Sequence, residues 1–190
     1  MNFAARTFVT LAAMASGSAV APAAETYSAD PVHSSVVFRV KHMNTSYAWG
    51  RFNNMSGSFT LDPADPSKSK MAFTVKAASV DSNSKERDNH LKSPDFFNAV
   101  QYPEITFASK SVAKASNGYQ VDGTLTFHGV TKPLSFLIVP TGTGKDMKGH
   151  PISGIDTNFV LKQSDFGITK MAAAIGDEVN VIVSIEGVKK

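Results

Sequence analysis

The chain has 190 residues, no cysteine and a formal net charge of +3 at pH 7. Without cysteine, a disulfide framework and cysteine-based metal or nucleophile chemistry are excluded. The basic residues form no run longer than two and do not interleave with the aromatic residues, which argues against a nucleic-acid-binding protein. The length suits one domain with a sizeable core.

Residues 1–23 have the pattern of a secretory signal peptide. Arg6 supplies the positive start, residues 7–15 form a short apolar run, and Ala21-Pro22-Ala23 fits an A-x-A cleavage site. The apolar run is shorter than the about 20 helical residues that cross a bilayer. We therefore expect export to the periplasm as a mature domain over residues 24–190. A helical or disordered N-terminal arm is the alternative.

From Ala24 onward, apolar and polar residues alternate with the period of two that is typical of β-strands. The alternating runs fall at residues 36–42, 58–61, 71–77, 119–128, 155–161 and 179–185. Residues 134–139 are apolar on both faces, which predicts a strand that is covered on both sides. Pairs such as Asn117-Gly118 and Gly176-Asp177 separate the runs as turns.

Counting the runs predicts eight to ten strands in one all-β domain. Short strands with regular turns favour an antiparallel barrel of about eight strands, and an immunoglobulin-like sandwich is the second choice. The chain lacks the Cys–Trp–Cys pattern of such sandwiches, and a helical segment interrupts its strands. The barrel is therefore the prediction.

Residues 83–107 contain that helical segment. Asn83 and Glu86 have the spacing of a capping box, which predicts a short helix with Arg87, His90 and Leu91 on one face. Ser93-Pro94-Asp95 predicts a second helical start. The segment is expected to form a lid over one end of the barrel.

The inward faces of the predicted strands are mostly apolar. A barrel of about eight strands is just wide enough for its side chains to fill it, or for one small ligand. Small or merely polar residues at Ala77, Gly123 and Thr157 indicate space inside. Apolar alternation fits a filled core equally well, so a closed-core structural barrel with no ligand remains an alternative.

Motifs along the mature chain match the pattern of one known family. They are Asp30-x-x-His33-Ser34, Val40-Lys41-His42-Met43, the block from Glu86 to Phe97, Tyr102-Pro103-x-Ile105-x-Phe107, Gly123-x-Leu125-Thr126 followed by Gly129-Val130-Thr131-Lys132-Pro133, Asp165-Phe166-Gly167-Ile168, and Gly176-Asp177-Glu178-Val179. On these residues the chain resembles the YceI-like family of secreted polyisoprenoid-binding proteins. The block from Glu86 to Phe97 is the most specific of them.

This resemblance implies an extended lipocalin-like antiparallel barrel in the periplasm. It also implies that a long isoprenoid, such as a polyprenyl quinone or a related amphiphile, lies in the lumen of a carrier that is not an enzyme and needs no other cofactor. The residues expected to line the lumen are Phe38, Val40, Phe73, Val75, Phe96, Phe107, Leu125 and Phe136. Candidates for the head-group end, chosen from chemistry and motif position, are His42, Trp49, Arg87 and His90. Transient membrane contact and a homodimer are compatible with such a carrier.

The polar candidates each have a second interpretation. Arg87 can donate a forked pair of hydrogen bonds to a head group, or it can pair with Asp88, Asp95 or another carboxylate and pin the helical segment to the barrel. His90 can contact the same head group or serve as a structural histidine.

The remaining candidates lie closer to the strands. His42 continues the apolar face of its strand, so we expect it to point inward near the strand end. Trp49 is expected either at the edge of the cavity or as a plug at the base of the barrel. A structural role is expected for His33, which precedes the first long strand.

The alternative function is a metal-dependent or acid–base hydrolase. Five histidines, together with Asp30 and Asp88, supply the residue types for such chemistry. No H-x-H, H-E-x-x-H or H-x-x-x-H spacing occurs, and there is no G-x-S-x-G elbow. The sequence therefore favours a binding protein without a metal site.

Overall fold

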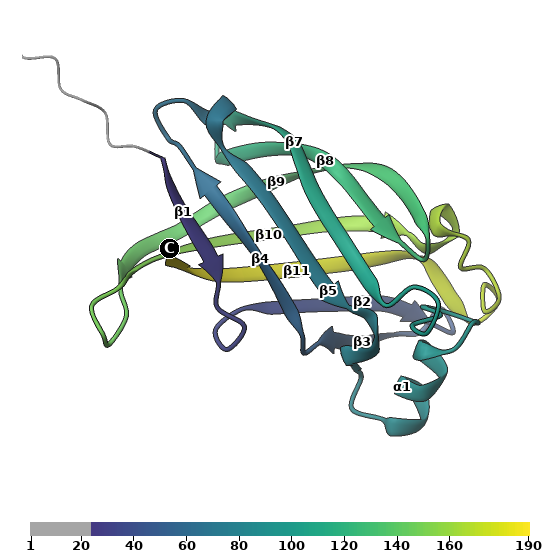
Figure 1. Cartoon of the computed structure of the whole chain (residues 1–190). Coiled ribbons are helices and arrows are strands. Elements are labelled where there is room, and N and C mark those ends of the chain that lie inside the picture. Colours follow the sequence, from purple (N-terminus) through teal and green to yellow (C-terminus); the bar gives the residue numbers. More distant parts are fainter. Residues whose placement is uncertain (1–23) are drawn as a thin grey trace, which may run out of the picture.

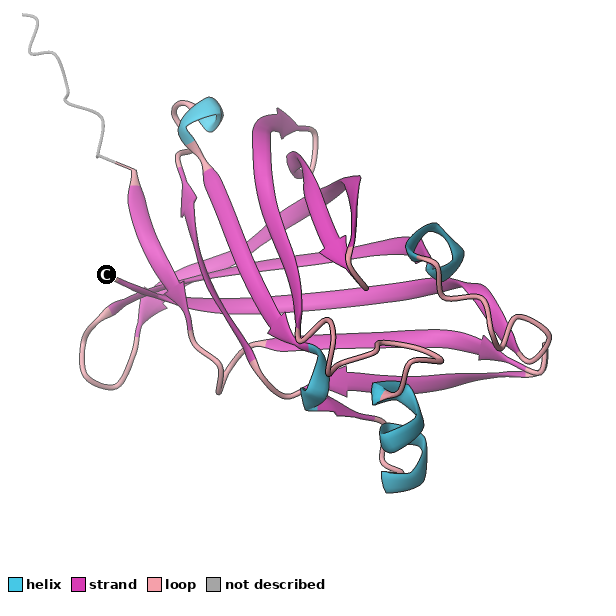
Figure 2. Cartoon of the chain, turned by 45° about the vertical axis from the view of Figure 1, so that its right-hand side comes forward, coloured by secondary structure: helices cyan, strands magenta, loops and turns pink. Residues whose placement is uncertain are grey.

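The structure is a computed structural model that describes residues 24–190, so the predicted signal peptide lies outside the described residues. Strands dominate this part of the chain (Figure 2). They are β1 (Glu25–Ala29), β2 (Ser35–His42), β3 (Ser46–Phe52), β4 (Met55–Leu61), β5 (Lys70–Lys76), β6 (Val80–Asp81), β7 (Glu104–Ala115), β8 (Gly118–Phe127), β9 (Val130–Lys145), β10 (Pro151–Lys162) and β11 (Ile175–Lys189). The helical elements are α1 (Lys85–Lys92) and the 3-10 turns η1 (Pro66–Lys68), η2 (Ala77–Ser79) and η3 (Gln163–Phe166). Within the described range, no helix is both long and apolar enough to cross a membrane.

Eight of the strands close into a ring. The order is β1-β4-β5-β7-β8-β9-β10-β11, and β1 pairs with β11 as well as with β4. Every pairing around the ring is antiparallel, and Tyr27 opposite Lys189 marks the closure. The predicted all-β antiparallel barrel of about eight strands is confirmed.

The remaining strands extend the wall at one end of the barrel. β11 is long enough to serve two partners, because its residues 187–189 pair with β1 and its residues 175–184 pair with β2. β3 and β6 follow beyond β2 in the same sheet. Figure 1 shows the β2–β3 pair running along the lower edge of the barrel, with α1 beside it.

The opposite end of the barrel is filled by side chains. Phe59, Val121 and Ile138 are fully buried there, and the Tyr27 ring stacks on Phe59 with centroids 5.4 Å apart. Burial of such side chains stabilises a fold by about 1.5–3 kcal/mol each. This end is therefore closed.

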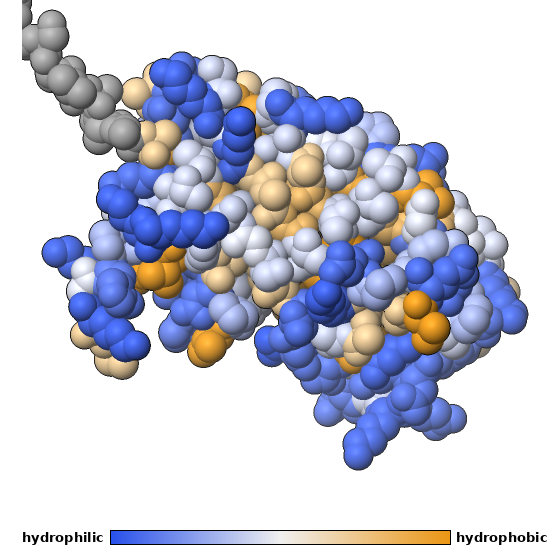
Figure 3. Space-filling model, in the orientation of Figure 1, coloured by the Kyte–Doolittle hydropathy of each residue, from blue (hydrophilic) through white to orange (hydrophobic). Residues whose placement is uncertain are grey.

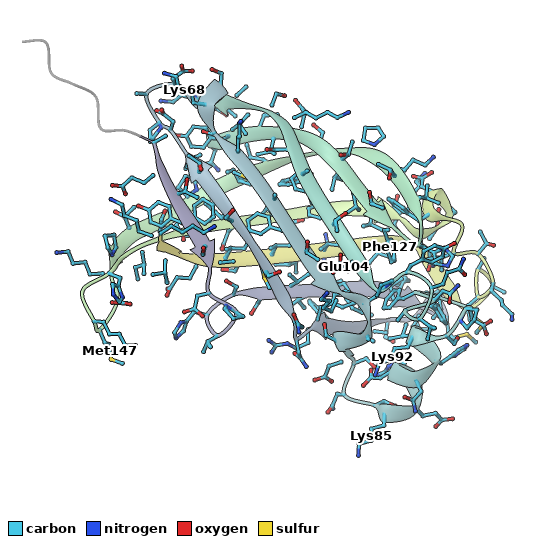
Figure 4. All side chains as sticks on the ribbon, viewed as in Figure 1. Lys68, Lys85, Lys92, Glu104, Phe127 and Met147 are labelled. Carbon is cyan, nitrogen blue, oxygen red and sulfur yellow. The ribbon has the colours of Figure 1, made fainter. Side chains whose placement is uncertain are left out.

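A second apolar cluster lies at the end that carries α1. It consists of Phe96, Leu125, Phe127, Phe166 and Ile168. Figure 4 shows Phe127 and Lys92 of α1 towards the same end of the molecule, with Lys68 and Met147 towards the other. The outer side of α1 is hydrophilic (Figure 3), and none of its residues is buried. The predicted lid is thus a short polar helix with an apolar turn behind it.

Two details of the helical segment were predicted wrongly. The cap of α1 is Ser84, whose Oγ accepts a hydrogen bond from the Arg87 N–H at 3.4 Å, and not Asn83. An N-cap residue needs an extended backbone, which Ser84 has, whereas Asn83 lies in the left-handed region with φ 62°. Ser93-Pro94-Asp95 starts a turn rather than a helix.

The turn has a clear physical reason. The N–H of Phe97 donates to the Leu91 carbonyl, and the N–H of Ala99 donates to the Lys92 carbonyl, both at 2.9 Å. The chain after α1 therefore folds back and satisfies the carbonyls at the end of that helix.

The prediction of a strand covered on both sides at residues 134–139 was also wrong. Leu134, Phe136 and Ile138 face the interior, while Leu137 and Val139 are only half-buried. The wall of a barrel has one inner face, and no second layer of the described residues lies outside β9 at this point.

Candidate functional site

A cavity of about 560 Å³ occupies the interior of the barrel. Apolar side chains from β2 to β5 and from β7 to β11 make up most of its wall. All twelve residues predicted from the sequence lie on this wall: Phe38, Val40, His42, Trp49, Phe73, Val75, Arg87, His90, Phe96, Phe107, Leu125 and Phe136. Whether each of them contacts a ligand stays a prediction.

Aromatic rings build one side of the cavity. Phe136 lies between Phe107 and Phe159, with ring centroids 5.0 Å and 5.1 Å apart, so three rings from β7, β9 and β10 form a continuous surface. Gly123 gives the Phe107 ring its room, because a Cβ at Gly123 would lie 2.6 Å from Phe107 Cζ.

The other small residues singled out in the sequence differ in their roles. Thr157 lines the cavity, and its Oγ1 donates a hydrogen bond of 2.7 Å to the Leu137 carbonyl, so this hydroxyl needs no ligand. Ala77 is buried in η2, outside strand β5, and is not part of the cavity wall. Of these three residues, Thr157 lines the cavity, Gly123 acts through the Phe107 ring, and Ala77 does neither.

The cavity opens at the edge of β3. Four consecutive residues, Ser46, Tyr47, Ala48 and Trp49, all line it. Because successive side chains of a strand point to opposite faces, a cavity lined by four in a row must wrap around the strand edge. Within residues 24–190, the part of β3 before Arg51 pairs only with β2. We call this opening the mouth.

The rim of the mouth carries exposed ring-bearing side chains. Trp49 is 48% exposed and therefore lies at the edge of the cavity, which was one of its two predicted positions; it does not plug the base. His42 lies at the end of β2, lines the cavity and is exposed to solvent. Its predicted position near a strand end is correct.

Arg87 is fixed by Ser82 and not by a carboxylate. Its Nε donates to Ser82 Oγ at 2.8 Å, and its Nη2 donates to the Ser82 carbonyl. Asp88 accepts hydrogen bonds from the N–H and the Oγ of the same serine at 2.8 Å and 2.6 Å. The alternative of an ion pair with Asp88, Asp95 or another carboxylate is not found among the described residues. One serine instead ties α1 to the segment after β6.

His90 takes part in a polar network that joins the turn after α1 to the segment before β11, and both parts of the chain contribute residues to the cavity wall. Its Nε2 lies 3.0 Å from one oxygen of Asp95, and the other oxygen accepts a hydrogen bond of 2.6 Å from Lys170 Nζ. Lys170 first, and His90 second, hold the pKa of Asp95 below its usual value of 3.8. The His90 ring also packs edge-on against Phe96, with centroids 5.0 Å apart.

A separate titratable group consists of Asp30, His33 and Glu186, whose ligand atoms lie within 4.8 Å of one another. His33 Nδ1 is 2.8 Å from Asp30 and 3.6 Å from Glu186, and this contact with Asp30 raises the pKa of His33. None of the three lines the cavity. Asp88, the other carboxylate of the hydrolase alternative, bonds to Ser82 and is not part of this group, so the structure does not assemble the acid–base set.

Several wall residues were missed in the sequence. Phe159, Leu161 and Val181 belong to strands that the alternation predicted, and their positions on the apolar face were sufficient to find them. Tyr47 and Met171 carry no such signal, because one lies on the outer face of β3 and the other in a turn before β11.

Comparisons with known proteins agree with this geometry. The model of the YceI-like domain family matches residues 27–187. A UPF0312 protein of Yersinia enterocolitica is 41% identical over 157 residues, which cover 83% of this chain and 82% of that protein. A UPF0312 protein of Pseudomonas aeruginosa is 38% identical over 187 residues, which cover 95% and 98%.

Solved structures share the fold. A YCEI protein of Campylobacter jejuni matches with a TM-score of 0.69 and 32% identity over 79% of this chain and 90% of that one. BcnA of Burkholderia cenocepacia matches with a TM-score of 0.76 and 24% identity over 83% and 98%. A polyisoprenoid binding domain from Saccharophagus degradans, implicated in plant cell wall breakdown, matches with a TM-score of 0.64 and 17% identity over 86% and 98%.

Proposed function

The chain belongs to the YceI-like domain family, and from this premise we propose that it binds a polyisoprenoid or a similar long-chain amphiphile, such as a polyprenyl quinone, inside its barrel. The observation that carries the proposal is the cavity of about 560 Å³ with a wall of mainly apolar side chains. Ligand pockets in proteins usually measure about 300–1,000 Å³. The polyisoprenoid binding domain with the same fold supports this ligand class.

The distribution of polar residues suggests how such a ligand is oriented. His42, Arg87 and His90 line the cavity, whereas the far end of the barrel is filled by Tyr27, Phe59 and their neighbours. Burying an unpartnered polar group is costly, so a head group is more stable at the mouth. The hydrocarbon chain accordingly extends inward from there.

A binding role accounts for the polar groups better than catalysis does. Arg87, Asp88, His90 and Asp95 hydrogen-bond to protein partners that hold α1 and the following turn in place. A hydrolase needs a nucleophile or base aimed at a substrate atom. The cavity wall offers chiefly hydrocarbon surface, and a carrier needs nothing else. The cavity also argues against the closed-core barrel.

The pattern of residues 1–23 supports a periplasmic carrier. In that compartment, a chain-like lipid needs protection from water between membranes, which an apolar barrel cavity provides. The proposal therefore joins export with lipid carriage.

The test is solvent extraction of the protein from the periplasmic fraction of its own cells, followed by mass spectrometry of the extract and sequencing of the protein's N-terminus. We expect an isoprenoid amphiphile in near-equal molar amount and an N-terminus near Ala24. An extract that holds no lipid would argue against carriage, and an intact Met1 on cytoplasmic protein would argue against export.

A further inference from the structure

The outer face of the β2–β3 pair carries exposed aromatic side chains beside the mouth. Tyr47 is 50% exposed and Trp49 is 48% exposed, and Met43 in the adjoining turn is 59% exposed. Gly50 faces the lumen, since a Cβ there would lie 2.3 Å from Phe38 Cζ. Tyr47 and Trp49, which have the opposite parity in β3, therefore face outward.

The same outer face continues across the neighbouring strands. Register places Trp49 opposite Arg39, and Arg39 opposite Asn180, which in turn lies opposite Val160. Val160 is exposed, and so is Ile182 one row away. Clustered apolar exposure of this kind usually marks an interaction surface.

Two cations lie over these rings. The Arg39 guanidinium is 4.7 Å from the centroid of Tyr47 and 5.5 Å from that of Trp49, and Lys41 Nζ is 4.8 Å from Tyr47. Neither cation has a carboxylate within 4.0 Å anywhere in residues 24–190.

The charged groups that face this cluster come from β3, β10 and β11. They are Arg51, Lys162, Asp177 and Glu178. Both oxygens of Asp177 already accept hydrogen bonds from Ser164. Arg39 and Lys41 are thus available to an anion from outside the protein.

We propose that this surface, consisting of Arg39, Lys41, Met43, Tyr47 and Trp49, docks the protein on an anionic lipid bilayer with the mouth towards the membrane. Tyr and Trp rings favour the interface between head groups and hydrocarbon, and anionic head groups attract Lys and Arg beside it. The inference rests on the proposed function, because Trp49 and Tyr47 are also rim residues of the cavity. A lipid chain that enters beside them passes from bilayer to barrel with little exposure to water.

The experiment uses lipid-stripped mature protein and the fluorescence of Trp49, the single tryptophan of the chain. Vesicles of phosphatidylcholine, with or without phosphatidylglycerol, are titrated into the protein, and the acyl chains carry bromine as a quencher. We expect a blue shift and quenching with the anionic vesicles, and we expect added salt to weaken both. The double variant Arg39→Glu/Lys41→Glu should bind at least about ten-fold more weakly.

Two controls separate docking from other events. Lys110→Glu/Lys114→Glu makes the same change of charge on exposed residues of β7, and should bind vesicles as the wild type does. Val181→Phe narrows the lumen, so quenching that persists in this variant comes from the bilayer and not from an acyl chain inside the barrel.

Three results would overturn the inference. The protein could bind neutral vesicles as tightly as anionic ones, or Lys110→Glu/Lys114→Glu could weaken vesicle binding as much as Arg39→Glu/Lys41→Glu does. The third is a blue shift without vesicles that grows with protein concentration. The last would mean that a second copy pairs at the free edge of β3. Quinone binding without vesicles is measured separately. If it stays intact while docking fails, only this inference falls.

Discussion

Lys170 Nζ lies 2.6 Å from Asp95 Oδ1, which joins two segments that are 75 residues apart in the chain. Asp95 belongs to the turn after α1, and Lys170 to the segment that leads into β11. That segment also holds the β2–β3 turn, since the Met43 N–H donates to the Ala174 carbonyl at 2.7 Å. The parts of the chain that border the mouth are therefore tied to one another.

We predict that Lys170→Met loosens the mouth and speeds ligand release. The pair is exposed, so the effect should stay below about five-fold. Release rates can be measured by displacing a bound fluorescent quinone with an excess of unlabelled ligand. Lys68→Met, which removes the Lys68–Asp65 pair at the far end, is the matched control and should not change the rate.

Added salt and low pH should both weaken the Lys170–Asp95 ion pair. Dissolved salt screens and so weakens an exposed ion pair. The pKa of Asp95 is lowered in the folded state, so the stability that the ionised carboxylate contributes is present above pH 3.8 and is lost as the pH falls through the folded-state pKa. A release rate that ignores salt in the wild type would contradict a role for the Lys170–Asp95 pair at the mouth.

Arg87→Ala should destabilise the protein even without ligand, because it removes two hydrogen bonds to Ser82. Hydrogen bonds to charged groups contribute about 1.5–3 kcal/mol each, and partial exposure lowers the sum. We expect a loss of about 1–3 kcal/mol in the free energy of unfolding, measured with urea. Arg87→Lys should not restore it, since an ammonium lacks the forked geometry.

Ser82→Ala tests the same contact from the other side. If Arg87 acts through Ser82, the double variant should lose clearly less free energy of unfolding than the two single variants lose in total. Full stability of Arg87→Ala with a ten-fold weaker affinity would instead assign Arg87 to the head group.

Gly50→Ala should both destabilise the barrel and narrow the lumen. A Cβ at Gly50 would lie 2.3 Å from Phe38 Cζ, and the Phe38 ring also packs against Phe52 and Phe97, so we expect the ring to be pushed towards the lumen that it lines. Overpacking of this kind costs about 1–3 kcal/mol. Gly144→Ala, where the nearest atom is 3.7 Å away, is the control for thermal denaturation and ligand capacity. Equal behaviour of the two variants would argue against the close packing of Phe38.

Much of the fold could be predicted from the sequence because the barrel wall obeys a simple rule. In β8, Tyr119, Val121, Leu125 and Phe127 alternate with polar residues, and all four are buried. The same alternation identified which residues of β2 and β5 face the lumen. Backbone geometry was harder to predict. Asn83 has a left-handed backbone conformation, which an N-cap residue does not adopt, and Ser84 caps the helix instead.

Polar contacts over long separations could not be predicted. Lys170 and Asp95 meet only because the barrel brings the β10–β11 connection to the turn after α1. Likewise, Ser82 was not an expected partner of Arg87, because a serine hydroxyl leaves no pattern in the sequence that distinguishes it from any other. The position of the mouth depends on the part of the β3 edge that has no partner within residues 24–190, which is a property of strand order.

The contact between His33 and Asp30 predicts a dependence of stability on pH. Asp30, as the main cause, raises the pKa of His33 above 6.5, so the folded state favours the protonated ring. This contribution is fully present below pH 6.5 and is lost as the pH rises through the folded-state pKa. The difference in thermal midpoint between wild type and His33→Gln should therefore shrink from pH 5 to pH 9. A difference that is constant with pH would contradict this role.

Carriage of the hydrocarbon chain inside the barrel is tested most directly by a titration series of quinones that share one head group and differ in the number of isoprene units. Apolar burial should add about 1–2 kcal/mol per unit after ordering costs, and the gain should stop when the chain fills the cavity. In Val181→Phe, which places a ring in the lumen, the plateau should come at a shorter chain; Ile182→Phe, on the outer face, should leave it unchanged. An affinity in the wild type that does not depend on chain length would contradict the account.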